Sequence, residues 1–360
     1  MIEKKFDLND ITLISAEESD IYSRGQCDTS LKFITPYNVI IYFSLPLMSS
    51  PMDTVTSTDN YKKYRKNGII PCLPRDVYID CNYEYPHFQA FGLCEIEKSL
   101  HELRNNERNS RSYDETFYNH KNVIIDIANG HMSNLIYLIK EIKEKWPKMI
   151  LMVGNVGNPE TFINLALAGA DFIRVGIGVG AGCTTAANVG VNYPMGSLIS
   201  ECYELRKQYG DLIKTKIVAD GGVKNYSDII RSLALGADYV MCGSIFNKAI
   251  ESAGFNYLYG IRISYKLAEI LWRWGFPIKK KYRGMSTKAV QRSWGKSKLV
   301  TAEGITKYQK VEYTLEQWTE NFRDYLKSAM SYCNAKTLDD FIGKTKYVFI
   351  TQNALKRFEK

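Results

Sequence analysis

The chain has 360 residues, of which 45% are hydrophobic and 24% charged, a composition typical of a globular protein that folds in water. It lacks a run of about 18 apolar residues, and its charged N-terminus has no apolar core, so we expect neither a membrane span nor a signal peptide. The net charge of +8 is spread along the chain without a basic block. This disfavours a nucleic-acid binder and suits an enzyme that attracts anionic substrates.

The cysteines and histidines do not form recognisable metal or redox motifs. The eight cysteines are scattered without a CxxC pair, which disfavours zinc ribbons and fits a reducing, cytoplasmic environment. None of the four histidines lies near another potential ligand at metal spacing, so no metal site is predicted.

Eight short apolar runs alternate with segments of helical periodicity, and each run has the length of a strand buried on both faces. The runs are Val39–Met48, Gly68–Leu73, Gln89–Cys94, Asn122–Ala128, Met149–Val156, Asp171–Gly178, Lys216–Val223 and Asp238–Ile245. Alternation of strands and helices predicts parallel pairing. A closed (β/α)8 barrel, an α/β fold, is the simplest architecture at this length, and a doubly wound open sheet is the alternative.

Helical spacing of apolar residues is clearest in three of the intervening segments. They are Ser133–Lys145, Pro159–Ala168 and Ser227–Leu235. The last two are followed by the phrase Gly-Ala-Asp, whose glycine suits a helix C-terminus that leads into the next strand.

Two long excursions interrupt the regular spacing. About 45 residues separate the sixth and seventh strands, beginning with the glycine-rich segment Gly176–Thr185. The second, at about 255–315, is rich in Arg, Lys, Tyr and Trp and is predicted to be a flap or lid-like insertion. Residues 315–360 are expected to form closing helices and a short strand-like run, Tyr347–Gln352. We therefore expect one catalytic barrel domain over residues 1–360.

The strongest local motif is Gly-Ile-Gly-Val-Gly-Ala-Gly-Cys-Thr-Thr, which ends in Cys183, Thr184 and Thr185. Alternating glycines after a strand let the backbone approach a ligand and present N–H groups to an anion. The segment does not fit the dinucleotide-binding G-x-G-x-x-G pattern. A cysteine at the end of such a loop is a candidate covalent nucleophile, although a lone cysteine is more often a small buried hydrophobe.

Polar or glycine residues end four more strands. Gly221 and Gly222 follow Asp220, and Ser244 follows Gly243, at the ends of the seventh and eighth strands, where barrels commonly bind phosphate. Asp220 is well placed to accept hydrogen bonds from a ribose diol. The other two ends are Asp126–Gly130 and Gly154–Asn155. Convergence of these ends on one face predicts a nucleotide site, whereas each glycine alone fits a tight turn.

With these motifs in order, the chain resembles the inosine-5′-monophosphate dehydrogenase and guanosine-5′-monophosphate reductase family over nearly its whole length. The matching segments are Phe6–Leu13, Ser49–Thr56, Cys183–Thr185, Ala219–Gly222, Val240–Ser244 and Tyr282–Met285. The resemblance implies a (β/α)8 barrel, a purine nucleotide substrate, a nicotinamide cofactor and a homotetramer in which the cofactor reaches between subunits.

The resemblance also implies roles for individual residues. Catalysis would fall to Cys183, Thr185 and Glu303. The substrate would be bound by Ser50, Met52, Gly180, Asp220, Gly221, Gly222, Gly243, Ser244, Tyr282, Gly284 and Met285. The cofactor would be bound by Asp126, Asn129, Gly130, Asn155, Arg174, Gly176 and Gly178.

Three features favour the reductase branch. About 15 residues separate the second and third strands, which leaves no room for the regulatory CBS insert of the dehydrogenases. The segment from Tyr282 to Gly304 is short and has no Arg-Tyr pair to activate water, and Glu303 stands where dehydrogenases have Gln. The expected reaction is therefore NADPH-dependent conversion of GMP to IMP. Cys183 would add to C2, Thr185 and Glu303 would relay the proton for departing ammonia, and NADPH would supply hydride.

Several residues depart from the family pattern. They are Arg75 for a lysine, Cys94–Glu97 for small residues expected at the end of the third strand, Ala181 for a serine, Ala186 for an arginine, and Met195 for a glutamine. Three alternatives therefore stay open: a CBS-free IMP dehydrogenase that uses NAD, a purine nucleotide reductase with altered substrate, and a catalytically silent regulatory or nucleic-acid-binding relative.

Overall fold

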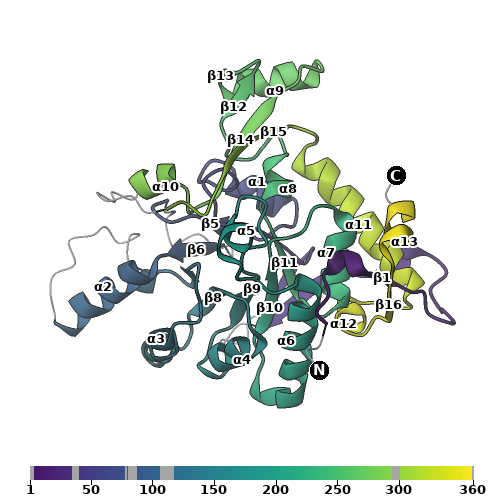
Figure 1. Cartoon of the computed structure of the whole chain (residues 1–360), viewed down its shortest axis with the longest axis horizontal. Coiled ribbons are helices and arrows are strands. Elements are labelled where there is room, and N and C mark those ends of the chain that lie inside the picture. Colours follow the sequence, from purple (N-terminus) through teal and green to yellow (C-terminus); the bar gives the residue numbers. More distant parts are fainter. Residues whose placement is uncertain are drawn as a thin grey trace.

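Eight parallel strands form a ring in the computed structural model, which describes residues 4–34, 40–77, 79, 87–105, 117–293 and 301–358 (Figure 1). In order around the ring they are β4 (Leu47–Ser49), β5 (Cys72–Leu73), β6 (Phe88–Phe91), β7 (Asn122–Asp126), β8 (Ile150–Val156), β9 (Phe172–Val175), β10 (Lys216–Asp220) and β11 (Tyr239–Cys242). The ring closes because Ser49 N donates to Ile70 O and Ile70 N donates to Leu47 O, both at 2.9 Å. The predicted barrel is confirmed and the open sheet is wrong.

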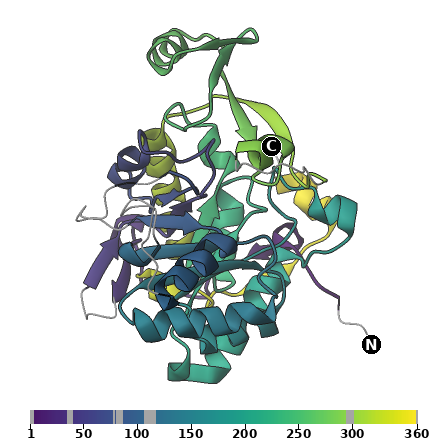
Figure 2. The same cartoon turned by 90° about the vertical axis from the view of Figure 1, so that its left-hand side faces the viewer.

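Helices cover the outside of the ring (Figure 2). They are α1 (Tyr61–Lys66), α2 (Leu93–Arg104), α3 (Ser133–Lys145), α4 (Pro159–Leu167), α6 (Met195–Tyr209), α7 (Tyr226–Ala234) and α11 (Leu315–Tyr332). The three predicted helices are confirmed as α3, α4 and α7, with ends within one residue. Local capping explains the start of α4, because Asn158 Oδ1 accepts hydrogen bonds from Glu160 N and Thr161 N at 2.9 and 3.1 Å.

Aromatic side chains close the N-terminal end of the barrel. Phe88, Phe172 and Tyr239 are the first residues of β6, β9 and β11, and each is at most 3% exposed. The ring centroids of Phe88 and Phe172 lie 5.4 Å apart, and those of Phe172 and Tyr239 lie 5.6 Å apart. This packed floor leaves the opposite end, at the strand C-termini, for a site.

Most of the predicted strands are shorter in the structure, and two of them differ for an identifiable reason. The run Val39–Met48 divides into β3 (Ile40–Phe43), which pairs antiparallel with β2 (Leu31–Ile34), and the barrel strand β4; Val39 lies outside the described residues. Pro46 between them has no N–H to donate to a ladder. The third barrel strand ends at Phe91 rather than Cys94.

A helix start explains the early end of β6. Glu95 Oε2 accepts the Gly92 N–H at 2.8 Å, which caps the N-terminus of α2. Cys94 and Glu97 therefore lie in α2 and do not end the third strand as predicted.

The segment predicted as a flap contains a small antiparallel sheet of its own, which projects from the barrel with α9 (Tyr265–Arg273) at the top of Figure 1. Its strands, in spatial order, are β13 (Ile261–Ile263), β12 (Asn256–Leu258), β14 (Lys279–Arg283) and β15 (Thr306–Lys310). The short helix α10 (Lys288–Ser293) follows β14, and residues 294–300 lie outside the described ranges. We call this sheet with α9 the flap.

The C-terminal segment returns to the N-terminus. After α11 and α12 (Leu338–Phe341), β16 (Tyr347–Phe349) pairs antiparallel with β1 (Ile11–Leu13), and α13 (Gln352–Phe358) follows. The strand-like run predicted at Tyr347–Gln352 is confirmed, apart from its last residues. Within the described ranges, no helix has the length and apolar character needed to cross a membrane.

Candidate active site

Two adjoining cavities lie at the C-terminal ends of the barrel strands. The smaller has a volume of about 120 Å³ and the larger about 300 Å³. Residues that line both are Ser50, Met52, Gly180, Asp220 and Tyr282. The shared walls show that one elongated ligand could reach from the smaller cavity into the larger.

The smaller cavity gathers most of the predicted substrate residues. Those that line it are Ser50, Met52, Gly180, Asp220, Gly221, Gly222, Gly243, Ser244 and Tyr282. Bare backbone is required here: Gly221 has φ +97°, and a methyl group on it would lie 3.1 Å from Gly180 N. Glycine N–H groups and the Ser244 hydroxyl give the cavity the donor set that suits a phosphate. The binding roles of these residues stay predictions.

The larger cavity brings Cys183 together with residues from both predicted groups. Of the predicted residues, Asp126, Asn155, Arg174, Gly284 and Met285 line it with Cys183. Its wall is mostly apolar around these few polar groups, as is usual for sites that bind a planar ring.

Cys183 is held by the segment that leads into β15. Thr184 N donates to Glu303 O at 2.8 Å, and Ile305 N donates to Gly182 O at 3.0 Å. This antiparallel bridge fixes Glu303 beside the start of α5 (Thr185–Val189). Residues far apart in the sequence are thereby brought to one point.

A chain of hydrogen bonds links the thiol to a carboxylate. Cys183 Sγ donates to Thr185 Oγ1 at 3.1 Å, and the Thr185 hydroxyl donates to Glu303 Oε2. Cys183 is half-buried and lines the cavity, so the thiol can meet a ligand while its proton has a path to Glu303. The three residues predicted to act together therefore lie in contact.

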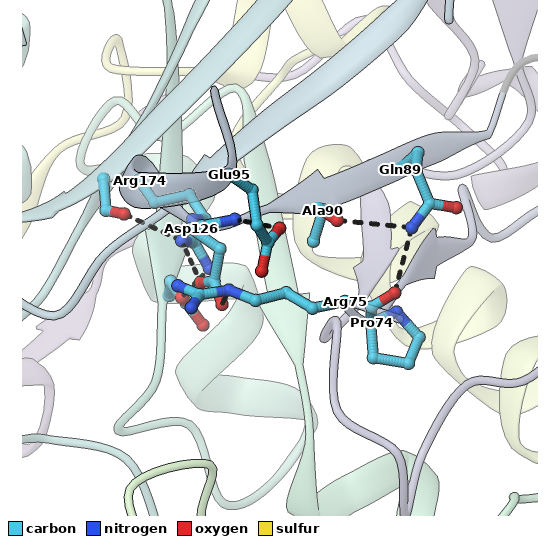
Figure 3. Close-up of polar contacts among 10 residues, drawn as sticks. Pro74, Arg75, Gln89, Ala90, Glu95, Asp126 and Arg174 are labelled. Atoms are coloured by element: carbon cyan, nitrogen blue, oxygen red, sulfur yellow. Dashed lines mark hydrogen bonds and ion pairs between the residues drawn. The ribbon is translucent and has the colours of Figure 1, made fainter. Parts of the chain in front are cut away.

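Below the thiol, a buried ion network holds the ends of β7, β9 and β10. Arg174 Nη2 donates to Asp126 Oδ1 at 2.6 Å and to Gly154 O at 2.8 Å, and Nη1 lies 3.5 Å from Asp220 Oδ2 (Figure 3 shows the part around Asp126). Burial opposes ionisation of Asp126, but Arg174 and Arg75 outweigh it and lower its pKa. Burial raises the pKa of Asp220, which shares Arg174 with Asp126.

Comparison with known proteins identifies the family of the chain. A family model described as the IMP dehydrogenase / GMP reductase domain matches residues 118–359. The chain belongs to this family. GMP reductase 2 of Homo sapiens is 26% identical over 359 residues, which cover 97% of this chain and 95% of that protein. GMP reductase 1 of Mus musculus is 27% identical over 350 residues, 97% and 96% of the two chains.

Dehydrogenase relatives match a shorter part. Inosine-5′-monophosphate dehydrogenase of Chlorobaculum parvum is 35% identical over 236 residues, 65% of this chain. The match spans only 46% of the length of that dehydrogenase. Membership of the IMP dehydrogenase / GMP reductase family places the protein among oxidoreductases and implies a nicotinamide nucleotide as cofactor.

The larger cavity fits a nicotinamide ring next to Cys183. Ile127, Ala128 and Met285 offer apolar surface. Arg174 is 3% exposed, and its Nε has no hydrogen-bond partner among the described residues. A buried donor of this kind is satisfied when a polar group of a ligand approaches it.

Four of the predicted cofactor residues do not line either cavity. They are Asn129, Gly130, Gly176 and Gly178. The two glycines after β9 shape the cysteine loop: methyl groups on them would lie 2.5 Å from Asp220 O and 2.9 Å from Ala186 N. Gly130 N donates to Asn155 O at 2.8 Å. These residues support the loops, and a direct role in cofactor binding stays a prediction.

Several residues that line the cavities were not among the predicted site residues. Lys224 and Ala181 line the smaller cavity, and Arg75 lines the larger one with its Nε 3.4 Å from Asp126 Oδ2. A methyl group on Gly92 would lie 2.7 Å from Arg75 Nη1, so the bare backbone of Gly92 makes room for the guanidinium. Only the departure from the family's lysine signalled Arg75, and Lys224 had no signal beyond its place two residues after a glycine pair.

An ion pair that was not predicted connects the flap to the first barrel loop, although both partners lie in segments that match the family. Arg283 on β14 donates through Nε to Asp53 Oδ1 and Oδ2 at 3.1 and 3.0 Å. Tyr282 and Met285 on either side line the cavities. Met195, a departure from the family's glutamine, is 1% exposed, and its Sδ would be 3.0 Å from a methyl group on Gly176, so it packs beneath the loop.

Proposed function

We propose that the protein is a purine nucleotide reductase that converts GMP to IMP and releases ammonia. The observation that carries this proposal is the chain Cys183–Thr185–Glu303, which joins a nucleophile to a carboxylate through one hydroxyl. A leaving amine needs a proton, and a chain that removes the thiol proton at one end can return it to ammonia. The near full-length match to two mammalian GMP reductases supports the same reaction.

Each part of the nucleotide is assigned to the cavity whose lining suits its chemistry. The phosphate lies in the smaller cavity against the N–H groups of Gly222 and Gly243 and the Ser244 hydroxyl. Asp220, which lines both cavities, accepts hydrogen bonds from the ribose hydroxyls. The purine then enters the larger cavity with C2 over Cys183, between Met52 and Met285.

The covalent step is balanced by these residues alone. The sulfur of Cys183 bonds to C2 while its proton passes to Thr185 and Glu303, and the C2–N bond breaks as the same proton goes to the departing amine. A bound nicotinamide nucleotide supplies the hydride that replaces sulfur on C2. Asp126, Asn155 and Arg174 hold the nicotinamide end, and NADPH is the proposed form.

The same fold can be assigned a second candidate reaction. The 35% identity to a dehydrogenase over 236 residues favours NAD-dependent oxidation of IMP. In that reaction Glu303 would have to activate water, whereas its hydrogen bond from Thr185, which itself accepts from the Cys183 thiol, suits transfer of the thiol proton to a departing amine. We therefore favour the reductase reaction over the dehydrogenase reaction. We also propose that the protein has a single domain, is cytoplasmic, forms a homotetramer and does not bind nucleic acid.

Glu303→Gln distinguishes the two reactions. The amide keeps the shape of the side chain but cannot take the thiol proton, so we expect kcat with GMP and NADPH to fall by about 100-fold, as is typical for loss of general acid–base catalysis. The KM for GMP should change little because Glu303 does not line either cavity. Wild-type oxidation of IMP with NAD, without turnover of GMP, would overturn the reductase assignment.

A further inference from the structure

A third cavity lies between the first barrel loop and the flap, apart from the active site. Its volume is about 590 Å³, and it shares no lining residue with the other two cavities. One wall comes from residues 57–63, before and within α1, and the others from residues 251–256 and 262–265. A cavity of this size is in the range that holds a small organic ligand rather than a single ion.

Two cations face this cavity without a carboxylate partner. Lys63 and Arg262 line it, and neither forms an ion pair with any described acidic residue. Lys63 Nζ instead donates to the Tyr265 hydroxyl at 2.9 Å and lies 4.4 Å from the centre of that ring. The Arg262 guanidinium carbon lies 3.6 Å from the centre of the Phe255 ring. Each cation therefore covers an aromatic ring. The charge of Lys63 is partly offset by the nearby Glu251, and the charge of Arg262 stays available for an anion.

Two carboxylates also line the cavity and limit the net positive charge. Glu251 Oε2 accepts the Leu315 N–H at 3.0 Å, and burial raises the pKa of Glu251. Asp59 is exposed to solvent. Lys280 lies fully buried behind the cavity, where it donates to Gly254 O at 3.4 Å. Burial lowers the pKa of Lys280 to about 7, so the site gains only part of that charge near neutral pH.

A buried acceptor in the cavity wall has no partner. Asn256 lines the cavity and is 5% exposed, and its Oδ1 accepts no hydrogen bond from any described residue. An unsatisfied buried amide oxygen is unfavourable, and a ligand with an N–H or O–H donor would satisfy it. The hydroxyls of Ser57 and Ser264 add further neutral polar groups.

We propose that this cavity is a second ligand site for a nucleoside 5′-phosphate. Such a molecule combines the features that the walls address: an anion for Arg262 and Lys63, a flat ring for the exposed part of the Phe255 side chain, and a hydrogen donor for Asn256 Oδ1. Inorganic phosphate would use only the cations, and a neutral nucleoside only the rings and the acceptor. The inference does not depend on which reaction the active site catalyses.

Isothermal titration calorimetry on the full-length protein tests the proposal. AMP and ADP are titrated in the presence of GMP and NADP+, each just above the concentration that fills the active site, so that the substrate and cofactor sites are both occupied while little GMP competes for the third cavity. We expect binding in the micromolar to low millimolar range. Arg262→Glu should weaken it at least tenfold, and Arg262→Lys should restore most of the affinity. Arg262 is exposed, so its replacement should not unfold the chain. Lys266→Glu, an exposed position on α9 outside the cavity, makes the same type of charge reversal and should leave the affinity unchanged.

Three results would overturn the proposal. They are the absence of AMP and ADP binding to the wild type, equal loss of affinity in Arg262→Glu and Lys266→Glu, and binding of inorganic phosphate or adenosine as tight as that of AMP. Because calorimetry reports binding without turnover, these results stay interpretable even where GMP is not converted.

Discussion

Lys224 carries the only positive charge among the described residues that line the smaller cavity. It follows Gly221 and Gly222, and its side chain is exposed, so it can swing to a bound phosphate without reorganising the loop. Ala181 in the same wall offers no hydroxyl at a position where the family resemblance predicts serine. The lysine charge therefore compensates for a lost donor in the proposed phosphate site.

Lys224→Met should raise the KM for GMP about tenfold with kcat unchanged, because a charge-assisted contact to phosphate is worth about 1.5 kcal/mol. The effect should shrink as salt is added, since the lysine is exposed. Steady-state kinetics at low and high salt measure both. Lys214→Met removes an exposed charge outside the cavities and serves as control; an equal rise in KM would show that only net charge matters.

At the level of single residues, position after a strand was the informative signal. Asp220 and Gly243 lie at the ends of β10 and β11, and Cys183 lies in the glycine-rich loop after β9, so the parallel strands bring them together. Glu303 could be assigned only through family resemblance, because its contact with Thr185 depends on how the flap segment returns to the barrel. Lys224 could not be predicted, since an exposed charge in a loop carries no periodic pattern, and the family motif that contains Asp53 did not indicate its partner.

At the scale of elements, the aspartate of the repeated sequence Gly-Ala-Asp connects the start of its strand to the neighbouring strand. Asp171 Oδ2 accepts from Leu151 N at 2.7 Å, and Asp238 Oδ2 accepts from Ile217 N at 2.8 Å. Each aspartate thus joins the start of its strand to the neighbouring strand. They differ in charge environment. Burial opposes ionisation of both, but Lys216 and Arg206 lower the pKa of Asp238, whereas the pKa of Asp171 is raised despite Lys143.

Asp238→Asn should lower the free energy of unfolding at pH 7 by about 3 kcal/mol, because it leaves the Arg206 guanidinium partly buried without its counter-charge. A depressed carboxyl pKa stabilises the fold above about pH 4, and this contribution is lost as pH falls through the lowered value. The difference between wild type and variant should therefore shrink between pH 5 and pH 3, as measured by urea unfolding.

Asp171→Asn provides the matched control for that pH dependence. Because the pKa of Asp171 is raised in the fold, the wild type gains stability from this group as pH falls through that value. The difference between wild type and this variant should therefore grow in the wild type's favour at low pH. A parallel trend in the two variants would contradict the assigned electrostatics.

The sequence pattern predicted elements best where periodicity and caps agree. The helix at Ser133–Lys145 was predicted with both ends correct because its apolar spacing is regular. The run Val39–Met48 was predicted as one strand because apolar composition does not reveal a bend, and Pro46 was the only local sign of the division. Cys94 was assigned to a strand because Gly92 was not recognised as the start of α2.

On the scale of the whole molecule, the candidate active site is assembled from three distant parts of the chain. The first barrel loop supplies Ser50 and Met52, the loop after β9 supplies Cys183, and the flap supplies Tyr282. The barrel itself follows from strand–helix alternation. The seating of the flap does not, because it depends on side-chain contacts such as Asp53 with Arg283. The third cavity is a product of that seating and was therefore invisible in the sequence.

The most direct test of the central claim is to measure NADPH consumption and ammonia release together, with GMP as substrate, for the wild type and Cys183→Ala. The wild type should consume NADPH and release ammonia in equal amounts. The variant should do neither while still binding GMP, because the phosphate and ribose contacts do not involve the thiol. Turnover that survives in Cys183→Ala, or a wild type that binds GMP without converting it, would contradict covalent reduction at this site.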